Sequence, residues 1–107
     1  MAISREAVED FWAANVGNGV AMNGPLLWVY FFTNDNRFLL EQAIARLEEL
    51  GYRYVAILHP DEDDNTREYT LHVERVEVHS IDSLLTRCGE LGELCIGDFD
   101  GFDAGSV

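Results

Sequence analysis

The order of helical and extended patterns along this 107-residue sequence predicts an α+β fold. Three observations support the prediction. Residues 26–33 form a nearly continuous apolar run, rich in aromatic and β-branched residues, which is typical of a central strand. Residues 38–50 repeat apolar positions at helical spacing. Residues 52–59 and 68–78 flank a polar, acidic turn, which indicates a hairpin.

A helix is predicted ahead of the first strand. Ser4 is a suitable N-cap, and acidic residues follow it near the positive end of the helix dipole. The apolar face of this helix consists of Ala7, Val8, Phe11 and Trp12, and the glycine-rich residues 17–19 end it. We expect residues 1–25 to form an N-terminal helix and connector, and residues 26–107 to form the main part of a single globular domain.

The strand at residues 26–33 is apolar on both of its faces. One face carries Trp28, Tyr30 and Phe32, and the other carries Leu27, Val29 and Phe31. A strand of this kind lies in the centre of a sheet that is covered on both sides. We expect the two later helices to cover one face. The N-terminal helix, a second subunit or a partner would then cover the other.

The helix at residues 38–50 ends at Gly51, and a strand and an acidic turn follow it. The second arm of the hairpin changes phase along its length. Its first part places Tyr69, Leu71 and Val73 on one face, whereas Val76 and Val78 belong to the other. Because side chains alternate strictly along a strand, this change predicts a bulge or bend near residues 74–75.

The last helix begins after Ser80 and leads through Gly97 into a closing strand at residues 97–107. Its apolar stripe consists of Ile81, Leu84, Leu85, Cys88, Leu91 and Cys95. Gly89 and Gly92 are unfavourable in a helix, and we expect them to mark close packing on the sheet. In the closing strand, we expect another backbone to come close to Gly101.

After the N-terminal helix, the predicted order is strand, helix, strand, strand, helix, strand. This is the order of the ferredoxin-like split βαβ fold, βαββαβ, in which an antiparallel sheet carries both main helices on one face. The sequence therefore predicts a ferredoxin-like sandwich preceded by a helix.

The composition is strongly acidic, with 20 Asp and Glu against 7 Lys and Arg and a formal net charge of −13. Direct DNA or RNA binding is disfavoured, because it depends on cations that neutralise phosphates. Anionic membrane surfaces are disfavoured for the same reason, and a basic protein is the natural partner. The alternative is that the acidity only keeps the protein soluble. No leader and no long apolar run is visible, so we expect a cytoplasmic protein.

Cysteine and histidine do not form a recognisable site. On one helix, Cys88 and Cys95 would lie roughly 10 Å apart, too far for a disulfide, so both should stay reduced. They also make a poor zinc site. The histidines lack the i, i+4 spacing of helical metal ligands, although His72 could lie beside His59 across the hairpin. We expect no metal and no cofactor.

The acidic residues do not form a recognisable catalytic set. Residues 61–64 lack the central glycine of a calcium loop and its final glutamate, so they are either a solvated turn or a contact for a basic partner. Regular alternation would place Asp98 and Asp100 on one face of the closing strand and Asp103 on the other, which does not suit one reacting centre. No nucleophile set, phosphate loop or dinucleotide fingerprint is present. We therefore expect a protein that is not an enzyme.

Three segments form a recognisable combination: the aromatic strand at residues 28–32, the Leu-Gly-Tyr that ends a helix at residues 50–52, and the aromatic-Asp-Gly-aromatic motif within residues 97–102. Together they resemble the RraB family, regulators of ribonuclease E activity. The resemblance covers roughly residues 26–107. Family members commonly carry Trp at the position of Phe102.

The resemblance implies a ferredoxin-like domain that acts by binding protein, as the namesake members bind ribonuclease E and reduce its activity. On this basis, the expected partner-binding residues are Asp61, Glu62, Asp63, Asp64, Asp98, Asp100 and Phe102. We expect residues 100–102 mainly to close the sheet, with direct partner contact as the alternative. Two other functions stay open. One is an immunity protein that neutralises a toxin nuclease, and the other is a domain that binds a small molecule or a second copy through the open sheet face.

Overall fold

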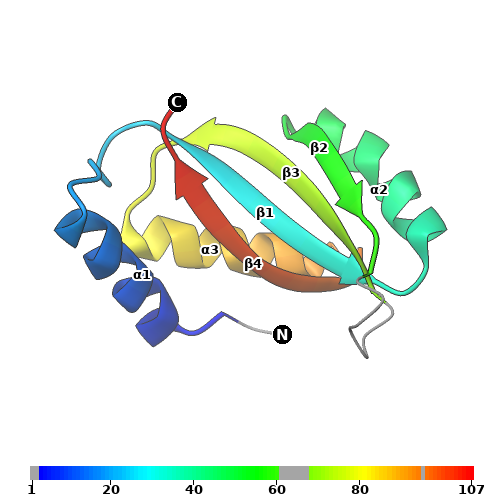
Figure 1. Ribbon diagram of the computed structural model, residues 1–107, viewed down its shortest axis with the longest axis horizontal. Coiled ribbons are helices and arrows are strands. Elements are labelled where there is room, and N and C mark those ends of the chain that lie inside the picture. Colours follow the sequence, from blue (N-terminus) through cyan, green and yellow to red (C-terminus); the bar gives the residue numbers. More distant parts are fainter. Residues whose placement is uncertain (1–2, 61–67, 95) are drawn as a thin grey trace.

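The computed structural model describes residues 3–60, 68–94 and 96–107. Along the chain these residues form the predicted order of elements (Figure 1). The elements are α1 (Arg5–Gly17), β1 (Leu26–Asn34), α2 (Arg37–Glu49), β2 (Arg53–Leu58), β3 (Tyr69–Glu77), α3 (Ile81–Glu93) and β4 (Asp98–Gly105).

The strands form one four-stranded sheet in the order β2-β3-β1-β4, and every neighbouring pair is antiparallel. β1 is paired along both of its edges, as the apolar character of both its faces predicted. The fold is α+β, and its strand order is compatible with the ferredoxin-like arrangement expected from the sequence.

Side-chain caps start the helices at the expected positions. Ser4 Oγ accepts a hydrogen bond from the backbone N–H of Ala7, at 3.1 Å. Ser80 and Ser83 form a reciprocal capping box, with N···O distances of 3.1 and 2.8 Å. α2 is followed by its C-cap, Leu50, and then by Gly51, which adopts a φ of +94° that favours glycine.

The hydrophobic core lies between the sheet and the helices. Alternate β1 residues, Leu26, Trp28, Tyr30 and Phe32, face this core and are buried. The helices contribute their apolar stripes, including Leu40 and Leu47 from α2 and Leu84, Cys88 and Leu91 from α3. The two later helices therefore cover one face of the sheet, as predicted.

α1 packs on the same side of the sheet as α3. Its Val8 is fully buried, and its Phe11 ring lies 6.0 Å from the ring of Trp28, on the helix-covered face. An ion pair of 2.7 Å joins Arg5 to Asp82 at the start of α3. Figure 1 shows α3 behind the strands with α1 beside it. Of the three coverings considered for the opposite face, α1 is therefore ruled out.

The predicted bulge near residues 74–75 is wrong. The register between β1 and β3 runs without interruption from Leu26–Glu77 to Asn34–Tyr69. Only the apolar pattern changes phase, and the backbone does not. Arg75 and Glu77 occupy core-side positions, where polar partners satisfy them. The actual irregularities lie in β2, between Tyr54 and Ala56, and in β4, opposite residues 31–32.

The expectations for the glycines also require correction. A Cβ on Gly101 would meet no atom within 4 Å, whereas one on Gly97 would lie 2.3 Å from the carbonyl oxygen of Thr33. The close backbone approach is therefore at Gly97. At Gly89 and Gly92 a Cβ would also meet no atom within 4 Å, so these residues do not mark close packing.

Candidate protein-binding surface

A β-bulge at Asp100 determines how the closing strand presents its side chains. Phe31 of β1 is opposite Gly101, but the next residue, Phe32, is opposite Phe99, so Asp100 is the extra residue. Gly101 has a φ of +143°, a conformation that L side chains rarely adopt. The glycine of the motif is thus explained by the bulge.

The bulge lets both aromatic residues of the motif face the core. Phe99 is 3% exposed and packs against Phe32, with ring centroids 5.5 Å apart. Phe102 is half-buried and meets Phe11 of α1 edge to face at 4.9 Å. Without an extra residue between them, positions 99 and 102 would lie on opposite faces. Phe102 therefore lies among core aromatics.

The same bulge also changes which face of the sheet the later aspartate occupies. Asp98 is paired with Thr33 and Asp103 with Val29, and these β1 residues share the face opposite the helices. The prediction that Asp98 and Asp103 occupy different faces is therefore wrong. Their partners are four positions apart on β1, or roughly 13 Å along the strand, so the two aspartates still do not form one reacting centre. Asp98, Asp100 and Asp103 are exposed.

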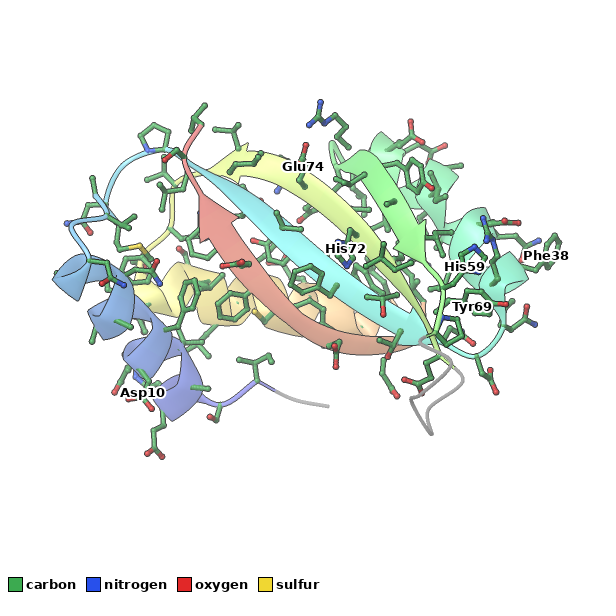
Figure 2. The ribbon with its side chains drawn as sticks, viewed as in Figure 1. Asp10, Phe38, His59, Tyr69, His72 and Glu74 are labelled. Carbon is green, nitrogen blue, oxygen red and sulfur yellow. The ribbon has the colours of Figure 1, made fainter. Side chains whose placement is uncertain are left out.

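The sheet face opposite the helices, which we name the open face, has an apolar middle. It is formed by Leu27, Val29 and Phe31 of β1, Ala56 and Leu58 of β2, and Thr70, His72, Glu74 and Val76 of β3. Val76 is 50% exposed and Leu58 is 49% exposed. Figure 2 labels His72 and Glu74 on β3, on the side of the sheet turned away from α3.

The polar residues in the middle of the open face are paired or uncharged. Glu74 is 6% exposed and forms an ion pair with Arg53 of β2. His72 packs its ring edge to face against Phe31, with centroids 4.5 Å apart. Burial lowers the pKa of His72 below its ordinary value, so this imidazole is neutral at pH 7. The middle of the face therefore carries no unpaired charge among the described residues.

A buried polar cluster lies on the other side of the sheet, centred on Glu77. Tyr30 Oη donates to Glu77 Oε1 at 2.5 Å, and His79 Nε2 lies 2.8 Å from the same oxygen. Arg75 Nε donates to Oε2 at 2.8 Å, and Arg87 Nε lies 3.2 Å from Oε2. Both carboxylate oxygens are thus held by several donors.

The environment of Glu77 keeps its side chain in the ionised, carboxylate form. Burial disfavours the carboxylate, but hydrogen bonds from His79, Tyr30 and Arg75 outweigh this and lower the pKa of Glu77 to about 2. Burial and the adjacent carboxylate raise the pKa of Tyr30 above its ordinary value. These groups satisfy one another, so the cluster stabilises the fold. The sequence signal for this cluster is the phase change of the apolar pattern in β3, from which a bulge is wrongly predicted.

The remaining candidate residues lie apart from one another. His59 contacts Arg37 at 3.1 Å and the ring of Tyr69, and it does not lie beside His72, whose partner in β2 is Ala56. Cys88 is a free, buried thiol whose pKa is raised by burial to about 12. Cys95 and the acidic residues 61–64 lie outside the described residues.

The described part of the chain contains neither a metal-binding cluster nor a membrane-spanning helix. Within residues 3–60, 68–94 and 96–107, no group of three or more His, Cys, Asp and Glu side chains is placed to hold a metal ion. Over the same ranges, no helix has the length and apolar character needed to cross a membrane.

The sequence model of the family described as Regulator of ribonuclease activity B, RraB, matches residues 5–104. The chain belongs to the RraB family. RraB proteins are regulators rather than enzymes, and they bind ribonucleases. The match begins in α1, which the motif resemblance did not include. A comparison with curated proteins finds no match.

Proposed function

We propose that this protein is a non-enzymatic regulator that binds a ribonuclease and lowers its activity, with ribonuclease E as the first candidate. The observation that carries the proposal is the RraB family match over residues 5–104. The net charge of −13 supports it, because an enzyme that acts on RNA presents basic surface to phosphates. A strongly negative protein can occupy such a surface and is steered to it. The cytoplasm is the proposed compartment.

The proposed contact includes the exposed aspartates of β4, Asp98, Asp100 and Asp103. β4 is an edge strand, so a partner can approach these carboxylates from the side of the sheet. Among the described residues, none of the three forms an ion pair within this chain. The acidic residues 61–64 stay part of the proposal. Phe102 is left out, because it packs against Phe11.

The test is calorimetric titration of the full chain into purified ribonuclease E of the same organism, at low and high salt. The variant D98N/D100S/D103N removes three carboxylates from β4. Its matched control, D10N/E48Q/E49Q, removes three exposed carboxylates from α1 and α2. Exposed ion pairs contribute about 0.2–1 kcal/mol each, so the β4 variant should weaken binding about 3- to 100-fold at low salt and less at high salt.

The control variant should lose less than half of the binding free energy that the β4 variant loses. Equal losses in both variants would mean that only overall charge matters and would remove β4 from the interface. No binding by the unaltered chain at low salt would contradict ribonuclease E as the partner.

A further inference from the structure

We propose that the open face of the sheet binds an amphipathic α-helix of the regulated ribonuclease, with the apolar stripe of that helix on β1, β2 and β3 and its basic flank over β4. This inference rests on the proposed function, and it adds the surface and the chemistry of the partner segment.

The open face has apolar side chains that the described part of the chain does not cover. All three described helices contribute to the core on the opposite face. Val76 and Leu58 remain about half exposed, at 50% and 49%, and Val29 and Phe31 lie between them and β4, half-buried. Exposed apolar surface that is contiguous and rimmed by polar residues is typical of a binding site.

The dimensions of the apolar area suit one helix. Val76 lies level with residue 27 of β1 and Leu58 lies level with residue 33, so the area spans roughly 20 Å along the strands, and the three strands β1, β3 and β2 span roughly 10 Å across the sheet. A helix with its side chains is about 10–12 Å wide. A single helix would therefore cover the apolar middle of the face and leave β4 along its flank.

The charges along the open face indicate which flank of the partner helix should be basic. Asp98 and Asp103 project from β4 on the open face, and no ion pair within the described residues neutralises them. Across the sheet, Arg53 of β2 is already paired with Glu74. Among the described residues of this face, the unpaired negative charge therefore lies along β4. A helix with Lys or Arg on one flank complements this arrangement.

A second copy of the chain is the competing occupant, and charge opposes it. Each copy carries a net charge of −13, and two open faces in contact would bring the aspartates of both β4 strands into one interface. Juxtaposed like charges of this kind are unfavourable.

The test uses a pair of matched double variants. L58Q/V76T replaces two half-exposed apolar side chains of the open face, and Thr retains the β-branched shape that suits a strand. The control V16T/L39Q changes the same residue types on α1 and α2, where Val16 is 54% and Leu39 is 46% exposed. Binding to full-length ribonuclease E is measured for both variants, after circular dichroism has shown that both are folded.

L58Q/V76T should weaken binding about 10- to 100-fold, and V16T/L39Q should bind within about twofold of the unaltered chain. Equal affinities for the two variants would overturn the proposal while the proposed function stood. If the unaltered chain fails to bind ribonuclease E, the proposed function fails as well, and the two failures are thus distinguishable.

A second measurement identifies the partner segment. Overlapping ribonuclease E peptides of about 20 residues, long enough for several helical turns, are titrated into the full chain with labelled methyl groups. The peptides that shift the methyl signals of Val29, Leu58 and Val76 should be amphipathic, with basic residues on one flank. Shifts confined to core-side methyls would overturn the proposal, as would concentration-dependent shifts of the open-face methyls without peptide, which would indicate a second copy.

Discussion

Glu77 shows how one buried carboxylate can determine the side-chain phase of a strand. It lies in a strand whose first half is apolar on the core side, and it can take a core-side position itself because Tyr30, His79 and Arg75 form hydrogen bonds with it and Arg87 forms an ion pair. Val76 is therefore directed to the open face. The apolar area available for a partner and the buried cluster are thus two consequences of the same register.

Replacing this carboxylate should be severely destabilising. In E77Q, the positive charges of Arg75 and Arg87 lose the carboxylate that they share, and the free energy of unfolding should fall by about 3–5 kcal/mol. Urea unfolding measures this. The control E41Q removes an exposed carboxylate paired with Arg37 and should cost less than about 1 kcal/mol. Similar losses in the two variants would contradict the structural role of the cluster.

The cluster also predicts a dependence of stability on pH. The pKa of Glu77 is about 2 in the folded protein, below its ordinary value of 4.5, so the unfolded chain binds this proton more tightly. Its contribution is complete above pH 4.5 and is lost as the pH falls through 2, amounting to about 3 kcal/mol. The difference in stability between the unaltered chain and E77Q should therefore shrink over this range. If the difference in stability stayed constant over this range, the pH dependence could not come from Glu77.

Residue-level prediction from the sequence succeeded where alternation is regular. Trp28, Tyr30 and Phe32 face the core, and Leu27, Val29 and Phe31 face the other way, as predicted. It failed for the aspartates of β4, because one inserted residue at position 100 reverses the face of all that follows. Gly101 is a local signal, because a glycine inside a strand often marks a bulge, but it does not specify which neighbouring residue is the extra one.

At the scale of elements, the helix starts were predictable because caps are local. Ser4 and Ser80 each bind the first turn of the helix that follows them. The position of α1 was not predictable, because its Phe11 and Trp12 could pack on either face of the sheet. Its contacts with Trp28 and Phe102 on the core side depend on long-range geometry.

The glycines around α3 should respond in opposite ways to the same substitution. G97A places a Cβ 2.3 Å from the backbone oxygen of Thr33, at a φ of +152°, and should destabilise by more than about 2 kcal/mol. G89A meets open space within a helix and should stabilise by about 0.5–1 kcal/mol. Thermal unfolding of both variants measures the two effects. A neutral G97A would show that β4 does not approach Thr33 as described.

At the scale of the whole molecule, the proposal combines the acidic charge, the family and a sheet face that the described helices do not cover. The net charge of −13 predicted a basic partner rather than a nucleic acid, and the chain belongs to a family of ribonuclease regulators. The order of elements predicted the fold class, because it depends on patterns that each segment carries by itself. The proposed partner surface depends on which sheet face the described helices leave uncovered, and this follows from long-range packing that the sequence does not show.

The central claim is that this chain slows a ribonuclease by binding it. The most direct test is the initial rate of RNA cleavage by purified ribonuclease E of the same organism, measured as the chain is added in increasing amounts. We predict that the rate falls and reaches a plateau, and that the same additions of D98N/D100S/D103N or L58Q/V76T have a smaller effect. A cleavage rate that stays constant up to a large molar excess of the unaltered chain would contradict the account.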